Sequence, residues 1–251
     1  MTITIAPIRG LPPVQPGDDL AALLLSGLTH SALSLRAGDV VVVCQKVVSK
    51  AEGRVARLTD VVPSAFAQQL AGQTTEGKDP RVIEVILRET NRIVRMDRGH
   101  LIVETGPGWV CANAGVDESN SLGPDTVILL PKDPDASARA LRATFRERAG
   151  VEVAVLITDT FGRPWREGLV DFALGLAGMD AQLDLRGEHD LNGRELHHTI
   201  MAQADALAAA AGLLMRKGEG IPAALIRGYQ FAPAAGDAKG LIRAREFDLF
   251  R

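Results

Sequence analysis

Short runs of β-branched and aliphatic residues alternate along this chain with stretches of helical periodicity, and no other sequence feature constrains the fold as much. The strongest runs are DVVVVCQKVVSK (39–50) and VEVAVLITD (151–159), and IPAALIRGY (221–229) closes the series. Such runs are typical of strands that are buried on both faces. The sequence therefore predicts a sheet of core strands covered by helices.

Weaker signals complete the pattern. Strands are expected at 2–8 and 126–131, and antiparallel strands joined by the short turns RGH and GPG are expected over 92–116. Helical spacing predicts helices at 63–73, 79–90 and 133–150, a helix capped near Asp18 after the loop 11–19, and one long helix over 193–217. Because both kinds of strand signal occur, we predict a mixed α/β (α+β) fold rather than a purely doubly wound sheet. No repeat or linker divides the sequence, so residues 1–251 are expected to form a single domain.

Composition excludes several classes of function. The chain has 251 residues, a formal net charge of −3 and 4% aromatic residues, which argues against a nucleic-acid partner. Its longest apolar stretches, such as 20–28, are too short to cross a membrane, and the N-terminus lacks a signal-peptide core. Cys44 and Cys111 have no metal-type or redox-type spacing and indicate small buried side chains in a reducing compartment. His197 and His198 fall on the predicted long helix without a further ligand at metal spacing, so neither is assigned a role. We expect a cytoplasmic protein that binds neither nucleic acid nor membrane.

Polar residues gather with glycine in five clusters near the ends of predicted strands. The clusters are GLPPVQPGDD (10–19), QKVVSKAEGR (45–54), NAGVDESN (113–120), ITDTFGRPWREG (157–168) and RKGEGIP (216–222). Loops beyond strand ends form the ligand sites of α/β sheets. Carboxylate, Thr and Asn oxygens suit Mg²⁺ or Mn²⁺, while Lys and Arg suit phosphate or carboxylate groups. The residues predict a metal-dependent, phosphate-handling enzyme, although no Walker A or G-x-G-x-x-G pattern occurs.

Each cluster also has a plainer structural interpretation. Asp117 and Asp159 would serve equally well as turn or cap residues, because Asp commonly bonds to nearby backbone. Lys46 and Lys50 fit solvated charges at the end of an apolar strand. The GEG segment around Glu219 fits an ordinary turn.

The segment ITDTFGRPWREGLVDFALGLAGM (157–179) resembles the signature of the coenzyme F420-0:γ-glutamyl ligase family. Further segments resemble the same family in the same order, so the resemblance covers nearly the whole chain: GLPPVQPGDDL, VVVCQKVVSKAEGR, HLIVETGPGWVCANAGVDESN, VILLPKDPDASARAL, GRELHHTIMAQADALAAAAGLLM and GEGIPAALIRG. Two positions depart from the family pattern, since Asn192 stands where Tyr is usual and Ala206 where an acid is usual. Neither matches a metal or phosphate position, so the departures concern substrate detail.

The resemblance implies a GTP-dependent, amide-forming ligase of coenzyme F420 biosynthesis that adds L-glutamate to coenzyme F420-0 through γ-linkages and an acyl-phosphate intermediate. Its implied partners are GTP, L-glutamate and coenzyme F420-0, with two Mg²⁺ or Mn²⁺ ions, and a need for K⁺ is left open. It also implies an intertwined homodimer with a mixed-sheet, two-subdomain fold. Two alternatives remain, namely a non-catalytic GTP-binding module and a metal-dependent GTP phosphohydrolase.

Transferred position by position, the resemblance assigns residues to the metal and to GTP. The expected metal ligands are Asp117, Asp159, Thr160 and Glu219. The expected GTP contacts are Leu11, Pro12, Pro13, Val14, Gln45, Lys46, Lys50, Asn120, Met215, Arg216, Lys217, Gly218, Glu219, Gly220, Ile221 and Pro222. Chemistry places Arg163 and Arg166 with Asp159 in the catalytic site, where guanidinium groups would bind the anionic substrate or phosphates.

Overall fold

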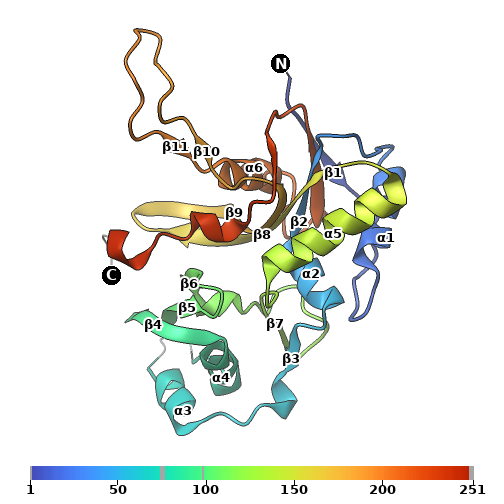
Figure 1. The fold of residues 1–251 in the computed structure, drawn as a ribbon. Coiled ribbons are helices and arrows are strands. Elements are labelled where there is room, and N and C mark those ends of the chain that lie inside the picture. Colours follow the sequence, from blue (N-terminus) through green and yellow to red (C-terminus); the bar gives the residue numbers. More distant parts are fainter. Residues whose placement is uncertain (1, 74–76, 98, 249–251) are drawn as a thin grey trace. The chain divides into compact units, whose positions relative to one another are not determined.

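A computed structural model describes residues 2–73, 77–97 and 99–248 of the chain (Figure 1). The chain divides into two compact units, which are described separately. Unit 1 comprises Met1–Pro12, Ala21–Cys44 and Pro134–Arg243, and unit 2 comprises Pro13–Leu20, Gln45–Asp133 and Ala244–Arg251. Helices and strands alternate in both units, so the predicted mixture of α and β structure is confirmed.

Unit 1 is built on a six-stranded sheet with the order β1-β12-β2-β8-β9-β13. These strands are β1 (Thr4–Ile8), β2 (Val40–Cys44), β8 (Ala154–Arg163), β9 (Arg166–Met179), β12 (Ala223–Arg227) and β13 (Pro233–Ala234). β2 and β8 pair in parallel, whereas the other neighbours pair antiparallel, which confirms the mixed sheet. Residues 40–43 and 154–157 are fully buried, which explains why both runs are apolar without alternation.

Helices α1 (Leu20–His30), α5 (Pro134–Ala149) and α6 (Gln203–Gly212) accompany this sheet, and α5 and α6 contact β9. The start of α5 is tied down by Asp135, whose Oδ1 accepts hydrogen bonds from the backbone N–H groups of Leu176 (2.9 Å) and Ala238 (2.8 Å). β9 passes close to this point at Gly175, where a Cβ would lie 2.3 Å from the Pro134 carbonyl oxygen. The remaining elements of unit 1 are the two-stranded pair β10 (Leu183–Asp184) and β11 (Ile200–Met201) and the 3₁₀ helix Ala238–Leu241.

Unit 2 combines short helices with two small antiparallel sheets. Its elements are α2 (Gln45–Ala51), β3 (Val55–Arg57), α3 (Ala65–Ala71), α4 (Pro80–Arg88), β4 (Thr90–Asp97), β5 (His100–Thr105), β6 (Val110–Ala112), β7 (Thr126–Ile128) and the 3₁₀ helices Leu58–Asp60, Asn113–Gly115 and Arg245–Phe247. β4, β5 and β6 form one sheet and β3 pairs with β7. The predicted hairpins over 92–116 are thereby confirmed, except that Arg98 of the RGH turn lies outside the described residues.

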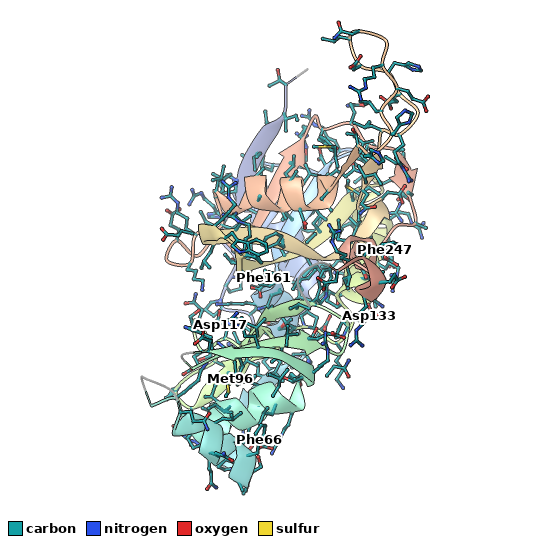
Figure 2. All side chains as sticks on the ribbon, turned by 90° about the vertical axis from the view of Figure 1, so that its left-hand side faces the viewer. Phe66, Met96, Asp117, Asp133, Phe161 and Phe247 are labelled. Atoms are coloured by element: carbon teal, nitrogen blue, oxygen red, sulfur yellow. The ribbon has the colours of Figure 1, made fainter. Side chains whose placement is uncertain are left out.

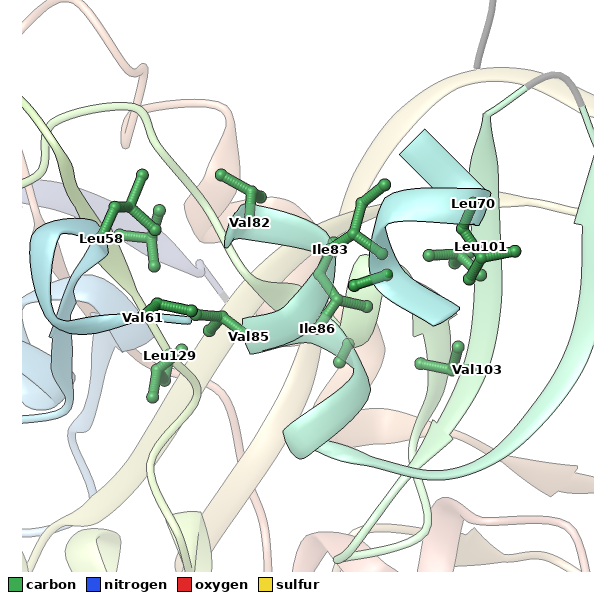
Figure 3. Packing of buried hydrophobic residues seen from close by; sticks show 13 residues of the cluster. Leu58, Val61, Leu70, Val82, Ile83, Val85, Ile86, Leu101, Val103 and Leu129 are labelled. Atoms are coloured by element: carbon green, nitrogen blue, oxygen red, sulfur yellow. The ribbon is translucent and has the colours of Figure 1, made fainter. Parts of the chain in front are cut away.

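The core of unit 2 forms where α4 lies against α3 and β5 (Figure 3). One apolar face of α4 is buried because its residues recur at helical spacing, and it contributes Val82, Ile83, Val85 and Ile86. Ser64 caps α3 and Asp79 caps α4, and Pro80 occupies the first position of α4. These caps satisfy backbone N–H groups that a helix start leaves without partners.

Two predicted elements differ from the structure. The run 39–50 is not one strand, because β2 ends at Cys44 and α2 begins at Gln45, so Lys46 and Lys50 lie on a helix. Tertiary burial of α2 at Gln45, Val47, Val48 and Ser49 overrides the β preference of its valines.

The long helix predicted over 193–217 is also wrong. Only α6 is helical there, and the segment before it forms the bridge between His189 and Glu195 and the strand β11. His197 and His198 therefore precede the helix instead of lying on it. The helix that does form is the alanine-rich part, in agreement with the high helix propensity of alanine.

Among the described residues, no helix is both long enough and apolar enough to span a membrane. Cys111 is buried, as predicted, whereas Cys44 is only partly buried.

Candidate active site

β8 and β9 extend as a two-stranded ribbon beyond the end of β2 (Figure 1). The last residue of β2, Cys44, lies opposite Thr158, so from Asp159 onward β9 is the only partner of β8 among the described strands. The prediction that this strand ends at Asp159 is therefore wrong, because β8 continues to Arg163 and contains both Asp159 and Thr160. Their half-buried side chains belong to the ribbon and not to a loop.

Asp159 and Thr160 point to opposite faces of this ribbon. Asp159 lies across from Phe172, whereas Thr160 lies across from Asp171, and successive side chains on a strand alternate between faces. The face of Asp159 also carries Phe161, whose ring stacks on that of Phe172 with the centroids 5.4 Å apart; Figure 2 shows Phe161 on this ribbon. The two expected metal ligands therefore lie in different surroundings, Asp159 beside aromatic rings and Thr160 beside Asp171.

A hydrogen bond joins Thr160 to a carboxylate that the sequence analysis missed. Thr160 Oγ1 donates to Oδ1 of Asp171 at 2.6 Å. Burial raises the pKa of Asp171, although the Thr160 hydrogen bond and the charge of Lys217 act in the opposite direction. Nearby on α6, Asp205 accepts a hydrogen bond from the backbone N–H of Ala173 at 3.0 Å, and burial raises the pKa of Asp205 as well. The missed signal was a lone acid inside the otherwise apolar stretch LVDFALGLA.

Two arginines face each other at the tip of the ribbon. Arg163 pairs with Arg166 across the strands, and like charges in directly opposed positions repel. Arg163 Nη2 donates to the carbonyl oxygen of Glu167 at 3.3 Å, while its buried Nε has no hydrogen-bond partner among the described residues. An anion bound at the tip would offset the repulsion between the two guanidinium groups.

The loop from Met215 to Pro222 connects α6 to β12. It forms an exposed turn in which the Glu219 N–H donates to the carbonyl oxygen of Arg216 at 3.1 Å, and their side chains form an ion pair at 3.4 Å. Gly220 has a φ of +65°, a conformation that favours glycine. The plainer interpretation of an ordinary turn describes this local structure, and a metal or GTP role for the loop stays a prediction.

The segment from Leu11 to Val14 includes side chains that are already packed. Leu11 lies against Gly27, where a Cβ would come within 2.6 Å of Leu11 Cδ1. The side chain of Val14 is buried at 2% exposure. A ligand at Val14 would therefore meet backbone groups.

In unit 2, Lys46, Asp117 and Ser119 form a connected polar cluster; Figure 2 labels Asp117. Lys46 Nζ lies 2.7 Å from Asp117 Oδ2 and 2.6 Å from Ser119 Oγ, and the Ser119 N–H donates to Asp117 Oδ1 at 2.7 Å. Burial acts to raise the pKa of Asp117, but the hydrogen bonds from Lys46 and Ser119 outweigh it and lower that pKa below its usual value. Asp117 is thus a turn-forming residue and also a carboxylate held ionised beside a cation.

Gln45, at the start of α2, is fully buried and has an unused donor. Its Oε1 accepts a hydrogen bond from Ser49 Oγ at 2.8 Å, but its Nε2 has no partner among the described residues. Buried polar groups without partners are rare in folded proteins. Lys50 lies half-buried in the last turn of the same helix, and Asn120 has a left-handed backbone with a φ of 54°.

The oxygen donors of these clusters are of the type that Mg²⁺ and Mn²⁺ prefer. In the described part of the chain, no three His, Cys, Asp or Glu side chains gather closely enough to hold a metal ion. Metal binding by Asp117, Asp159, Thr160 and Glu219 therefore stays a prediction.

Comparison with known proteins gives a consistent result. Residues 9–228 match the F420-0:gamma-glutamyl ligase family. The chain is 45% identical to the coenzyme F420:L-glutamate ligase of Methanothermobacter thermautotrophicus over the full length of both chains. It is 48% identical to the protein of that name from Methanopyrus kandleri, and 41% identical to that from Archaeoglobus fulgidus, with all of this chain and 98% and 97% of the relatives covered. The chain belongs to the F420-0:gamma-glutamyl ligase family.

Proposed function

We propose that this protein is a GTP-dependent ligase of coenzyme F420 biosynthesis that joins the amino group of L-glutamate to the carboxylate of coenzyme F420-0 and extends the tail through γ-linkages. The observation that carries the proposal is the similarity to relatives named coenzyme F420:L-glutamate ligase, which runs the whole length of this chain at 41–48% identity. The arginine pair at the ribbon tip and the ionised Asp117 supply charges of the kinds that such a reaction needs.

The proposed reaction has two steps because a carboxylate is a poor acyl donor. In the first, a carboxylate oxygen of F420-0 attacks the γ-phosphorus of GTP, GDP leaves, and an acyl phosphate forms. In the second, the glutamate nitrogen attacks the acyl carbon, inorganic phosphate leaves, and the nitrogen loses a proton. Phosphoryl transfer needs mainly positioning and charge neutralisation, and the acyl phosphate must be kept from water.

We assign the phosphates of GTP to basic and backbone groups. Lys46 and Lys50 would neutralise phosphate charge from α2, and the unused Nε2 of Gln45 would donate a hydrogen bond. The loop from Met215 to Ile221 would contribute backbone N–H groups, since Gly220 lets the backbone approach closely. In the segment from Leu11 to Val14, only Leu11 and Val14 have an N–H to donate, because the two prolines between them have none; the buried Val14 side chain leaves its backbone for the contact, and Pro222 would contact GTP through other atoms. Asn120 would complete the GTP contacts. The paired arginines at the ribbon tip would hold the anionic substrate.

We propose Asp117, Asp159 and Thr160 as ligands of Mg²⁺ or Mn²⁺, with Glu219 as a further ligand. Such ions, when bound, would neutralise the charge of the transferring phosphoryl group. Because Asp159 and Thr160 point to opposite faces of the ribbon, we expect them to serve different ions, in agreement with a two-ion site. We also propose a homodimer, which sedimentation velocity would test.

The test is a reaction of the full chain with F420-0, L-glutamate, GTP and Mn²⁺, with and without K⁺, followed by mass spectrometry. A ligase gives a glutamate-dependent mass increase with one GDP for each glutamyl residue added. GDP without that increase would identify a phosphohydrolase. If neither GDP nor a glutamylated product forms, the remaining interpretation is a GTP-binding module. We expect GTP to be preferred over ATP.

Variants of the same chain sharpen this test. Asp159→Asn keeps the side-chain shape but removes a negative charge, and we expect ligation to fall at least about a hundredfold, roughly 2.7 kcal/mol of transition-state stabilisation. Asp184→Asn is the matched control, because Asp184 is an exposed carboxylate on β10 paired with Arg186. Near-normal ligation by Asp159→Asn would remove Asp159 from the site.

A further inference from the structure

Asp171 is a charged residue in a part of β9 that is otherwise apolar, and its surroundings fix its carboxylate closely. The hydrogen bond that it accepts from Thr160 is 2.6 Å long, within the short range of charge-assisted O–H···O⁻ bonds. Asp171 lies in the same ribbon as Asp159 and Thr160, which are two of the expected metal ligands. It is not itself among the residues assigned to the metal or to GTP.

The end of α6 provides the space for this carboxylate. A Cβ at Gly212 would lie 2.7 Å from Asp171 Oδ2 and 2.8 Å from its Cγ, so a larger residue would displace the acid. The same helix is anchored to β9 by Asp205, whose Oδ1 accepts the N–H of Ala173, two residues beyond Asp171. Helix and strand are thus held in the register that presents Asp171 to Thr160.

The loop after α6 also acts on Asp171. Lys217 on this loop interacts electrostatically with the Asp171 carboxylate. Asp171 therefore links three elements: the strand with Thr160, the end of α6, and the loop that carries Lys217.

We propose that Asp171 is a positioning residue that orients the Thr160 hydroxyl for a divalent ion. A hydroxyl has one proton and two lone pairs, so a proton committed to Asp171 leaves Thr160 Oγ1 only as an acceptor or a metal ligand. Residues that form a hydrogen bond to a metal ligand in this way are important for binding, and their mutation typically lowers metal affinity about 10–100-fold. The inference rests on the proposed function, because it takes Thr160 to be a metal ligand.

The test measures Mn²⁺ binding to the full chain, without GTP or F420-0, by electron paramagnetic resonance titration of free Mn²⁺. Asp171→Asn should raise the Mn²⁺ dissociation constant at least about tenfold. Thr160→Val should raise it similarly, and adding Asp171→Asn to Thr160→Val should have little further effect, since Asp171 acts through Thr160. Thr160→Ser, which keeps the hydroxyl, should bind Mn²⁺ nearly as well as the unaltered protein.

Asp184→Asn is the matched control, because it alters an exposed carboxylate on β10 that is paired with Arg186 and not bonded to Thr160. It should leave Mn²⁺ affinity unchanged. If Asp171→Asn leaves Mn²⁺ affinity within twofold while Thr160→Val weakens it, the proposal for Asp171 is overturned and the proposed function stands. If Thr160→Val also has no effect, Thr160 is not a metal ligand and both assignments fail, whatever the ligation assay shows.

Discussion

The Lys46–Asp117–Ser119 cluster allows a prediction whose magnitude follows from its geometry. Asp117→Asn keeps the shape of the side chain but leaves one acceptor where the carboxylate has two, each now engaged at 2.7 Å. Losing a hydrogen bond to a charged group costs about 1.5–3 kcal/mol. Because the Lys46 and Asp117 side chains are 13% and 26% exposed, water recovers part of this loss. We therefore expect the free energy of unfolding to fall by about 2 kcal/mol.

The assay is urea unfolding in metal-free buffer, where a denaturant slope of about 3 kcal/mol/M converts this loss into a midpoint shift of about 0.7 M. A double-mutant cycle with Lys46→Met should give a coupling energy of at least about 1 kcal/mol. The control is Asp97→Asn, which breaks the exposed Arg95–Asp97 pair and should cost less than about 0.5 kcal/mol. A coupling energy below about 0.3 kcal/mol would refute the view that Lys46 and Asp117 stabilise each other.

Two further predictions concern stability. Gly175→Ala would force a Cβ to within 2.3 Å of the Pro134 carbonyl oxygen, and we expect calorimetry to show a melting temperature lower by about 6–12 °C, from a cost of about 3 kcal/mol; an unchanged value would mean that α5 moves away freely. The lowered pKa of Asp117 makes its contribution to stability complete above 3.8 and lost as the pH falls through its folded-state value, so the urea midpoint should drop more steeply below about pH 4 in the unaltered protein than in Asp117→Asn. Equal slopes would contradict it.

The core of the fold could be predicted from the sequence because its strongest signals come from burial. The runs at 40–44 and 154–157 are apolar without alternation, and both became central strands. The hairpins over 92–116 were also predictable, since glycine-containing turns separate alternating strands. These elements are specified by the residues that form them.

The failures share a physical cause. Val47 and Val48 favour strands on their own, yet they lie in α2 because helical spacing buries them. The strand predicted over 151–159 was too short, because Asp159 and Thr160 lie inside β8, where adjacent side chains point to opposite faces. Asp171 was missed because its partner, Thr160, lies eleven residues away across a hairpin. The surroundings of such residues are decided by contacts with residues far away in the sequence, and a single sequence does not reveal those contacts.

The pairing of β1 with β12 also affects how the chain emerges during synthesis. Thr4 lies opposite Arg227, so β1 has no partner strand until the residues up to Arg227 have been synthesised. At about 5–20 residues per second, this delay lasts roughly 10–45 s. The core of unit 2, from Leu58 to Leu129, is contiguous and can form early. The four valines of β2 have no β8 to pair with until Arg163 is made and no β12 until Arg227 is made, which makes the nascent chain a candidate for chaperone protection on the ribosome.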